Sequence, residues 1–141
     1  MQKPRAFPRI GGGDPALEVA ETYPDTKFIC TEADASADNV ASYVMACEQT
    51  AYVEGIIAAS MTKSDKLGAI GPIQGDSLVK IVNGYEDGAK SVNPDIEVQT
   101  AWTNSFVDTQ LAQEAAKAMI ENGVDVIKHC ANACGNGAIA A

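Results

Sequence analysis

The sequence predicts an α/β protein built on parallel sheets with helical crossovers. Short β-branched runs alternate with longer segments in which apolar residues recur at helical spacing. Glycines mark the positions where several of the predicted strands end. From residue 66 onward the order is strand, helix, strand, helix, strand, which is half of a doubly wound unit.

The N-terminal part is predicted to hold a helix, a strand and a second, longer helix. Residues 1–13 contain Pro4, Pro8 and three consecutive glycines, so we expect little regular structure there. Asp14 followed by Pro15 is typical of a helix start. The remaining predictions for this part are a helix that ends before Pro24, a strand at 27–31, an acidic loop at 32–38 and a helix at 39–61.

Gly55 lies inside the longer predicted helix. Glycine in a helix interior costs about 1 kcal/mol relative to alanine, so we expect it to mark close helix packing.

The second half is predicted in more detail because its helix ends have clear local markers. Asp108 is a typical N-cap, and Asn122-Gly123 is a typical left-handed helix terminus. The predicted strands are 67–70, 96–102 and 125–129, the helices begin near 76 and at 108, and the exit loops are 71–75, 103–107 and 132–137.

Composition excludes several classes of partner. The chain has 141 residues, of which 46% are hydrophobic and 21% charged, and its formal net charge is −9. An acidic chain is a poor match for nucleic acid or for an anionic membrane surface, because both require clustered Lys and Arg. No segment is long and apolar enough to span a bilayer, and the N-terminus lacks the apolar region of a signal peptide.

The cysteines do not predict a metal site. Cys30 and Cys47 lie in apolar patterns typical of buried small side chains. His129, Cys130 and Cys134 are close in sequence, but a structural zinc site needs four ligands and this chain has a single histidine. We therefore expect no metal and no cofactor.

The candidate ligand-binding residues lie in the exit loops, because open parallel sheets bind ligands beyond the carboxyl ends of their strands. For the glycines of 71–75 we favour a purely backbone role. Phe106 is an aromatic residue in a polar loop, and it either stacks on a ligand or packs in the core. The candidate ligand-binding residues are Asn104, Ser105, Phe106, Asn132, Asn136 and Gly137.

Enzymatic motifs are missing. The glycines around 68–75 do not have the G-x-G-x-x-G spacing, and no acidic residue ends the next strand at Trp102 to hold a ribose. No P-loop, nucleophile elbow or histidine-bearing triad is visible. We predict no catalytic residue and no enzyme activity, with a Rossmann-like nucleotide-binding enzyme domain as the alternative.

Six phrases of the chain stand in a distinctive order, and they are Ala16–Ala20, Tyr23–Phe28, Asn39–Ser42, Ala51–Ser64, Gly84–Asp95 and Ser105–Asp108. Any one phrase is weak, but their order and spacing together are specific. Together they resemble the basic membrane protein (BMP) family, the PnrA-like solute-binding lipoproteins of bacterial ABC transporters, and the resemblance extends from about Asp14 to the C-terminus.

The resemblance implies a type I periplasmic-binding-protein fold, in which two α/β lobes close on a solute. Residues 1–62 would be the C-terminal part of lobe 1, and residues 63–141 the N-terminal βαβαβ part of lobe 2. Phe106 would stack on a nucleoside base, and the 132–137 loop would supply polar contacts. The partners implied are a nucleoside-like solute and an ABC permease, and the location is extracytoplasmic with a membrane lipid anchor in the parent protein.

The chain also departs from the family pattern. It has no signal sequence or lipidated cysteine, and Glu32 stands near a position where the family shows aspartate. We expect a fragment composed of two half-lobes, without a complete cleft of its own. A ligand-sensing regulatory domain of the same fold is the other alternative, although no DNA-binding segment is visible.

Overall fold

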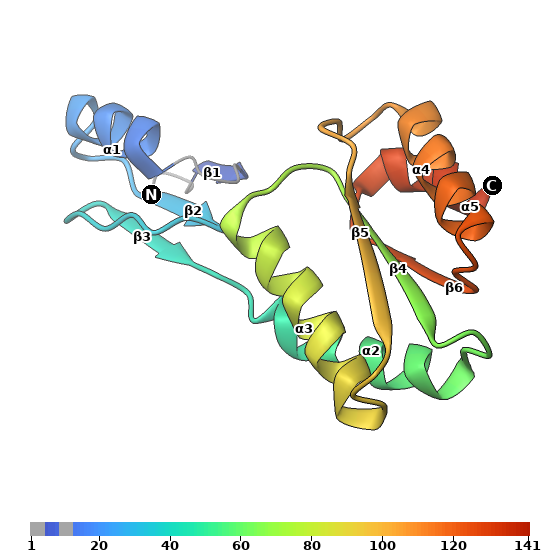
Figure 1. Cartoon of the computed structure of the whole chain (residues 1–141). Coiled ribbons are helices and arrows are strands. Elements are labelled where there is room, and N and C mark those ends of the chain that lie inside the picture. The colour runs from blue at the N-terminus through green and yellow to red at the C-terminus, as the bar shows by residue number, and fades with distance from the viewer. Residues whose placement is uncertain (1–4, 9–12) are drawn as a thin grey trace. The chain divides into compact units, whose positions relative to one another are not determined.

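The computed structural model describes residues 5–8 and 13–141, with side chains from residue 15 onward (Figure 1). The chain forms two compact units, Met1–Ala46 and Cys47–Ala141, each with its own parallel sheet. The parallel α/β class predicted from the sequence is confirmed. The division lies between Ala46 and Cys47, whereas the sequence predicted a boundary between residues 62 and 63, because the helix after Ala46 packs on the second unit.

The first unit has a three-stranded sheet in the order β1-β2-β3. Its elements are β1 (Arg5–Pro8), α1 (Gly13–Thr22), β2 (Phe28–Thr31) and β3 (Val40–Tyr43). Ala16 and Ala20 of α1 pack with Phe28 and Cys30 of β2, which confirms Cys30 as a buried small side chain. The predicted cap at Asp14 falls outside the described side chains.

Two predictions for this unit were wrong. Arg5–Pro8 is a strand that pairs in parallel with β2, although its composition predicted little structure. Val40–Tyr43 is a strand on the other side of β2, not the start of the long helix. The side-chain amide nitrogen of Asn39 lies 3.0–3.1 Å from the carbonyl oxygens of Ala20, Tyr23 and Thr26. These three contacts hold the start of β3 beside β2.

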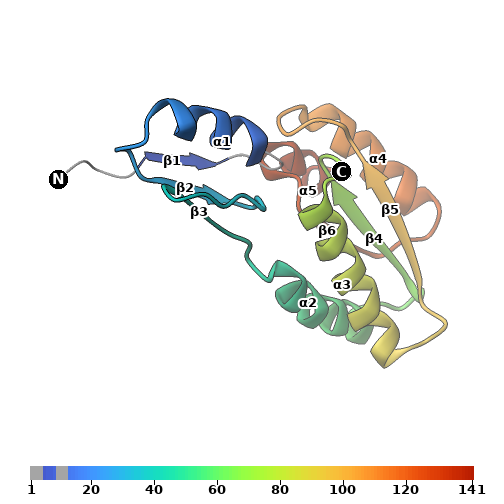
Figure 2. The ribbon, with the colours of Figure 1, turned by 90° about the vertical axis from the view of Figure 1, so that its left-hand side faces the viewer.

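The second unit contains the βαβαβ order that the sequence predicted. Its elements are α2 (Cys47–Met61), β4 (Lys66–Gly71), α3 (Asp76–Val92), β5 (Glu97–Trp102), α4 (Thr109–Glu121), β6 (Val126–His129), η1 (Asn132–Gly135) and α5 (Asn136–Ile139). The strands lie in the order β5-β4-β6. Helices α2 and α3 cover one face of this sheet, and α4, η1 and α5 cover the other (Figures 1 and 2).

Glycines allow α2 and α3 to lie in backbone contact. A Cβ atom built on Gly55 of α2 would lie 2.0 Å from the Tyr85 carbonyl oxygen of α3. One built on Gly88 of α3 would lie 1.9 Å from the Tyr52 carbonyl oxygen of α2. The predicted packing role of Gly55 is confirmed.

The markers of α4 also behave as predicted. The Asp108 side chain accepts a hydrogen bond from the Gln110 backbone N–H at 3.0 Å, and Gly123 has a φ of +88° just past the helix. The segment after β6 differs from the predicted exit loop, because residues 132–139 wind into η1 and α5. They can do so because Gly135 packs against the His129 ring and Gly137 against the Thr109 carbonyl.

A single carboxylate ties the turn between α2 and β4 to the start of β6. Asp125 accepts hydrogen bonds from Thr62 Oγ1 at 2.5 Å, Lys63 N at 2.7 Å and Ser64 N at 3.1 Å. The bond from Thr62, followed by those from the two backbone amides, lowers the pKa of Asp125 to about 2.

No helix within the described residues is long and apolar enough to cross a membrane.

Candidate functional site

The strand order of the second unit creates a topological switch point between β4 and β6. After β4 the chain turns to α3 on one face of the sheet, and after β6 it turns to η1 and α5 on the other. The two exits therefore diverge at the carboxyl edge of the sheet, which is where open α/β sheets bind ligands. The sequence predicted the exit loops but not the strand order that brings them together.

Hydrogen bonds join the three exits. Thr103 N–H, after β5, donates to the Gly71 carbonyl at the end of β4 at 2.9 Å. Cys134 N–H, after β6, donates to the Phe106 carbonyl at 3.1 Å. The candidate residues of the second and third loops therefore belong to one continuous surface.

Cys134 is the central contact of this surface. Its side chain is buried, its thiol donates to the Asp108 carbonyl at 2.8 Å, and its sulfur lies 3.4 Å from Thr103 Oγ1. It therefore holds the β5 exit against η1. All four cysteines are free thiols. Burial raises the pKa of Cys130, which keeps that thiol protonated.

In the β5 exit loop, Phe106 is half-buried and Asn104 is exposed with a φ of +53°. Asparagine tolerates this left-handed conformation better than most residues. Ser105 Oγ accepts hydrogen bonds from Val107 N at 3.2 Å and Asp108 N at 2.9 Å. The serine oxygen therefore shapes the turn that starts α4, while its hydroxyl hydrogen can still be donated to a ligand.

In the β6 exit, Asn132 and Asn136 are both exposed, and Asn132 has a φ of +49°. Gly137 is buried, and a Cβ atom there would lie 1.8 Å from the Thr109 carbonyl oxygen. Packing of α5 on α4 therefore requires glycine at this position. The amide side chains of the two asparagines remain available at the surface.

Trp102 is a residue that the sequence reasoning missed. It pairs with Gly71 in the register of β4 and β5, and a Cβ atom on Gly71 would lie 2.3 Å from the indole Cζ3. The half-buried ring therefore covers the end of β4 and adds an aromatic surface to the carboxyl edge. The available indication was an aromatic residue at the last position of the strand that follows the strand ending at the Gly71-Pro72 turn.

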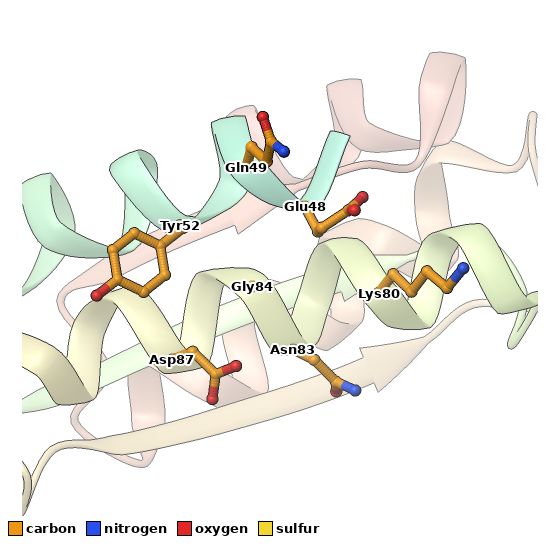
Figure 3. A pocket seen from close by; sticks show the side chains of 7 residues that line it. All are labelled: Glu48, Gln49, Tyr52, Lys80, Asn83, Gly84 and Asp87. Atoms are coloured by element: carbon orange, nitrogen blue, oxygen red, sulfur yellow. The ribbon is translucent and has the colours of Figure 1, made fainter. Parts of the chain in front are cut away.

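A separate groove of about 580 Å³ lies on the helical layer between α2 and α3 (Figure 3). It contains none of the candidate residues, and it is lined by Glu48, Gln49, Tyr52, Lys80, Asn83, Gly84 and Asp87. Among the described residues, no group of three or more His, Cys, Asp and Glu side chains is placed to hold a metal ion.

Comparison with known proteins places the chain in a family. Residues 13–141 match the model of the PnrA-like ABC transporter substrate-binding proteins. The chain belongs to this PnrA-like family. The resemblance read from the sequence phrases is thereby confirmed.

The PnrA-like chain is similar to curated proteins over most of its own length. It is 40% identical to a purine-binding protein of Brucella abortus, over 84% of this chain and 34% of that protein. It is 35% identical to the nucleoside-binding protein BmpA of Lactococcus lactis, over 88% of this chain and 36% of that protein. The chain thus spans about a third of the length of these relatives.

Solved structures agree on the fold. An ABC transporter solute-binding protein from Aeropyrum pernix superposes with a TM-score of 0.85 and 27% identity, over 96% of this chain and 41% of that one. A transcriptional activator from Bacillus halodurans superposes at 0.81 with 21% identity, over 97% of this chain and 47% of that one, which shows the shared fold alone. The predicted solute-binding-protein fold, present in part, is confirmed.

Proposed function

We propose that this chain is part of the solute receptor of an ABC transporter and contributes one side of a site for a purine nucleoside or a similar small solute. Family membership supports the receptor role. Two similar proteins whose names state purine or nucleoside binding support the ligand class. The main structural support is the joining of the β5 and β6 exits at the switch point, through the Cys134 to Phe106 backbone hydrogen bond.

Within this proposal each candidate residue has a physical role. Phe106, half-buried in its loop, offers its ring to a base, because a planar heterocycle gains from stacking on an aromatic face. The exposed amides of Asn104, Asn132 and Asn136 both donate and accept hydrogen bonds, which suits ribose hydroxyls and base edges. Ser105 donates its hydroxyl hydrogen, and the buried Gly137 lets α5 pack on α4, which holds the β6 exit in position.

We further assign the sheet β1-β2-β3 to lobe 1 and the sheet β5-β4-β6 to lobe 2 of a two-lobed receptor. Such a receptor acts by population shift, since the solute contacts both lobes only in the closed state. It carries out no chemistry. In the full-length protein it is extracytoplasmic, attached to the membrane by a lipid anchor, and delivers its solute to a permease.

Nuclear magnetic resonance with a panel of nucleosides tests the proposal on this chain. Half of a cleft binds weakly, so the amide resonances are followed with each nucleoside at about 1 mM, where weak complexes are populated. Purine nucleosides should shift the amides of the 103–107 and 132–137 segments, and pyrimidine nucleosides should shift them less. Unchanged resonances in both segments would contradict the proposal.

Phe106→Ala separates stacking from packing. Loss of a stacked aromatic should weaken nucleoside binding by about 1–3 kcal/mol, which is roughly 5-fold to 150-fold in Kd. Val107→Ala is the matched control, because its side chain is 75% exposed in the same loop and should leave affinity unchanged. If Phe106→Ala lowers the stability of the fold but leaves affinity at the parent value, Phe106 is a packing residue instead.

A further inference from the structure

A short connection joins the two units of this chain. Residues 44–46 lie between β3, which ends at Tyr43, and α2, which begins at Cys47, and they form neither helix nor strand. The units are the continuous ranges Met1–Ala46 and Cys47–Ala141, so the chain passes from one to the other once, at this connection. A change in the relative orientation of the units is therefore absorbed by the backbone angles of a few residues here.

Glu32 hydrogen-bonds to two points at the start of this connection. It directly follows β2, and its backbone N–H donates to the carbonyl oxygen of Tyr43, the last residue of β3, at 2.9 Å. Its side-chain oxygen Oε1 accepts a hydrogen bond from the backbone N–H of Met45 at 3.0 Å. Hydrogen bonds to a charged acceptor are stronger than neutral ones. With Tyr43 and Met45 both held, the rotatable part of the connection is shortened to the bonds between Met45 and Cys47.

The backbone of Glu32 adopts a conformation that suits other residues better than glutamate. Its φ is +54°, in the left-handed region, which glycine adopts readily and asparagine tolerates better than glutamate does. A turn that served the backbone alone would be more stable with glycine. Residues held in such conformations are concentrated at ligand clamps and switch regions. Glutamate at this position therefore indicates a role for its carboxylate.

The loop after Glu32 gives this carboxylate a fixed base. Ala33 and Ala35 are buried in the core of the first unit. The backbone N–H of Ala35 donates to Oγ of Ser42, in β3, at 3.1 Å. The carboxylate is thus attached to the packed part of the first unit. At the other end of the connection, α2 is fixed to the second unit by the close contact of Gly55 with α3.

We propose that Glu32 is a hinge-positioning residue, and that its carboxylate confines the rotation of the two units to the bonds between Met45 and Cys47. This inference rests on the proposed function, because the rotation that it confines is the closure of the two lobes. A hinge with fewer rotatable bonds samples fewer open orientations, so less of the free energy of solute binding is lost in ordering the lobes. The carboxylate therefore favours closure without contacting the solute.

Hydrogen exchange of the Met45 amide tests the anchor in this chain, with no solute present. The amide should exchange roughly tenfold or more slowly than it does in an unstructured peptide of the same sequence. Glu32→Gln keeps a side-chain oxygen at the same place and should retain most of this protection. Glu32→Gly removes the acceptor and suits the left-handed backbone, so the chain should fold while the Met45 amide exchanges freely. Asp34→Ala is the matched control, because it removes a charge from an exposed position of the same loop and should leave the Met45 amide protected.

Residual dipolar couplings measure the consequence for the two units. The alignment of each unit is determined separately, and the ratio of the smaller to the larger magnitude falls as the units move more freely relative to each other. This ratio should be lower in Glu32→Gly than in the parent, Glu32→Gln and Asp34→Ala. An unprotected Met45 amide in the parent would overturn the proposal. A Glu32→Gly chain that keeps the ratio of the parent, whatever its stability in urea, would overturn it as well, since Glu32 would then serve the fold of the first unit alone.

These measurements are independent of the nucleoside titration, because they use no solute. If nucleosides shift the 103–107 and 132–137 amides while Glu32→Gly leaves the ratio unchanged, the hinge role of Glu32 is wrong and the receptor role stands. If the ratio falls as expected while no nucleoside shifts those amides, the hinge role is supported and the proposed ligand class is wrong.

Discussion

Gly88→Ala tests whether α2 and α3 are held at backbone contact. The new Cβ atom would lie 1.9 Å from the Tyr52 carbonyl oxygen and 2.7 Å from its carbon. Both atoms belong to the backbone, so no side-chain rotation relieves the clash. The helices must separate by more than about 1 Å to reach ordinary contact distance, and close packing does not absorb such a shift without loss.

Two opposing effects decide the size of the change. Alanine is the better helix former by about 1 kcal/mol, which favours the variant. Overpacking a tight contact costs about 1–3 kcal/mol or more, and here the obstacle is a rigid helix backbone. We expect the overpacking cost to exceed the helix-propensity gain, so that Gly88→Ala lowers the free energy of unfolding by about 1–2 kcal/mol.

Urea denaturation followed by far-ultraviolet circular dichroism measures this difference. Asp87→Ala is the control, because it also introduces alanine, at the adjacent exposed position of α3. There the substitution changes helix propensity and creates no clash. That variant should be as stable as the parent or slightly more stable. If Gly88→Ala matched Asp87→Ala in stability, the close approach of the two helices would be refuted.

Two further predictions follow from individual contacts. The depressed pKa of Asp125 means that its contribution to stability is complete above the ordinary carboxyl pKa near 3.8 and is lost as pH falls through about 2. Asp125→Asn should therefore flatten the loss of stability measured by urea melts between these two pH values, and an unchanged profile would contradict the assignment. Gly71→Ala should displace the indole of Trp102, the single tryptophan of the chain, and shift its fluorescence emission toward that of an exposed ring, while Gly123→Ala, far from the indole, should leave the emission unchanged.

The helices and strands of the second unit could be predicted because their local markers agree with their tertiary environment. Asp108 caps α4 and Gly123 ends it with the left-handed conformation that glycine readily adopts. The continuous apolar run in β4 corresponds to a strand that is buried on both faces. The secondary structure of a segment can be predicted from its sequence when its local preference agrees with its packing in the fold.

Part of the candidate site could be predicted from the sequence. The segments that follow β5 and β6 were predicted, and the structure brings them together through Cys134. The contribution of Trp102 was not predicted, because it depends on the register that places its ring over Gly71. The helical course of residues 132–137, which were predicted as a loop, was not predicted either, since it depends on packing against α4.

The sequence by itself determined the α/β class, the order of elements after residue 66 and the family, because these depend on local periodicity, turn residues and ordered phrases. Tertiary structure decided the rest. Val40–Tyr43 is a strand because Asn39 and β2 hold it in place. The local periodicity of a sequence does not show which distant segments will pair with it. The order β5-β4-β6 creates the switch point, and strand pairing across many residues is a property of the packed chain that no local pattern contains.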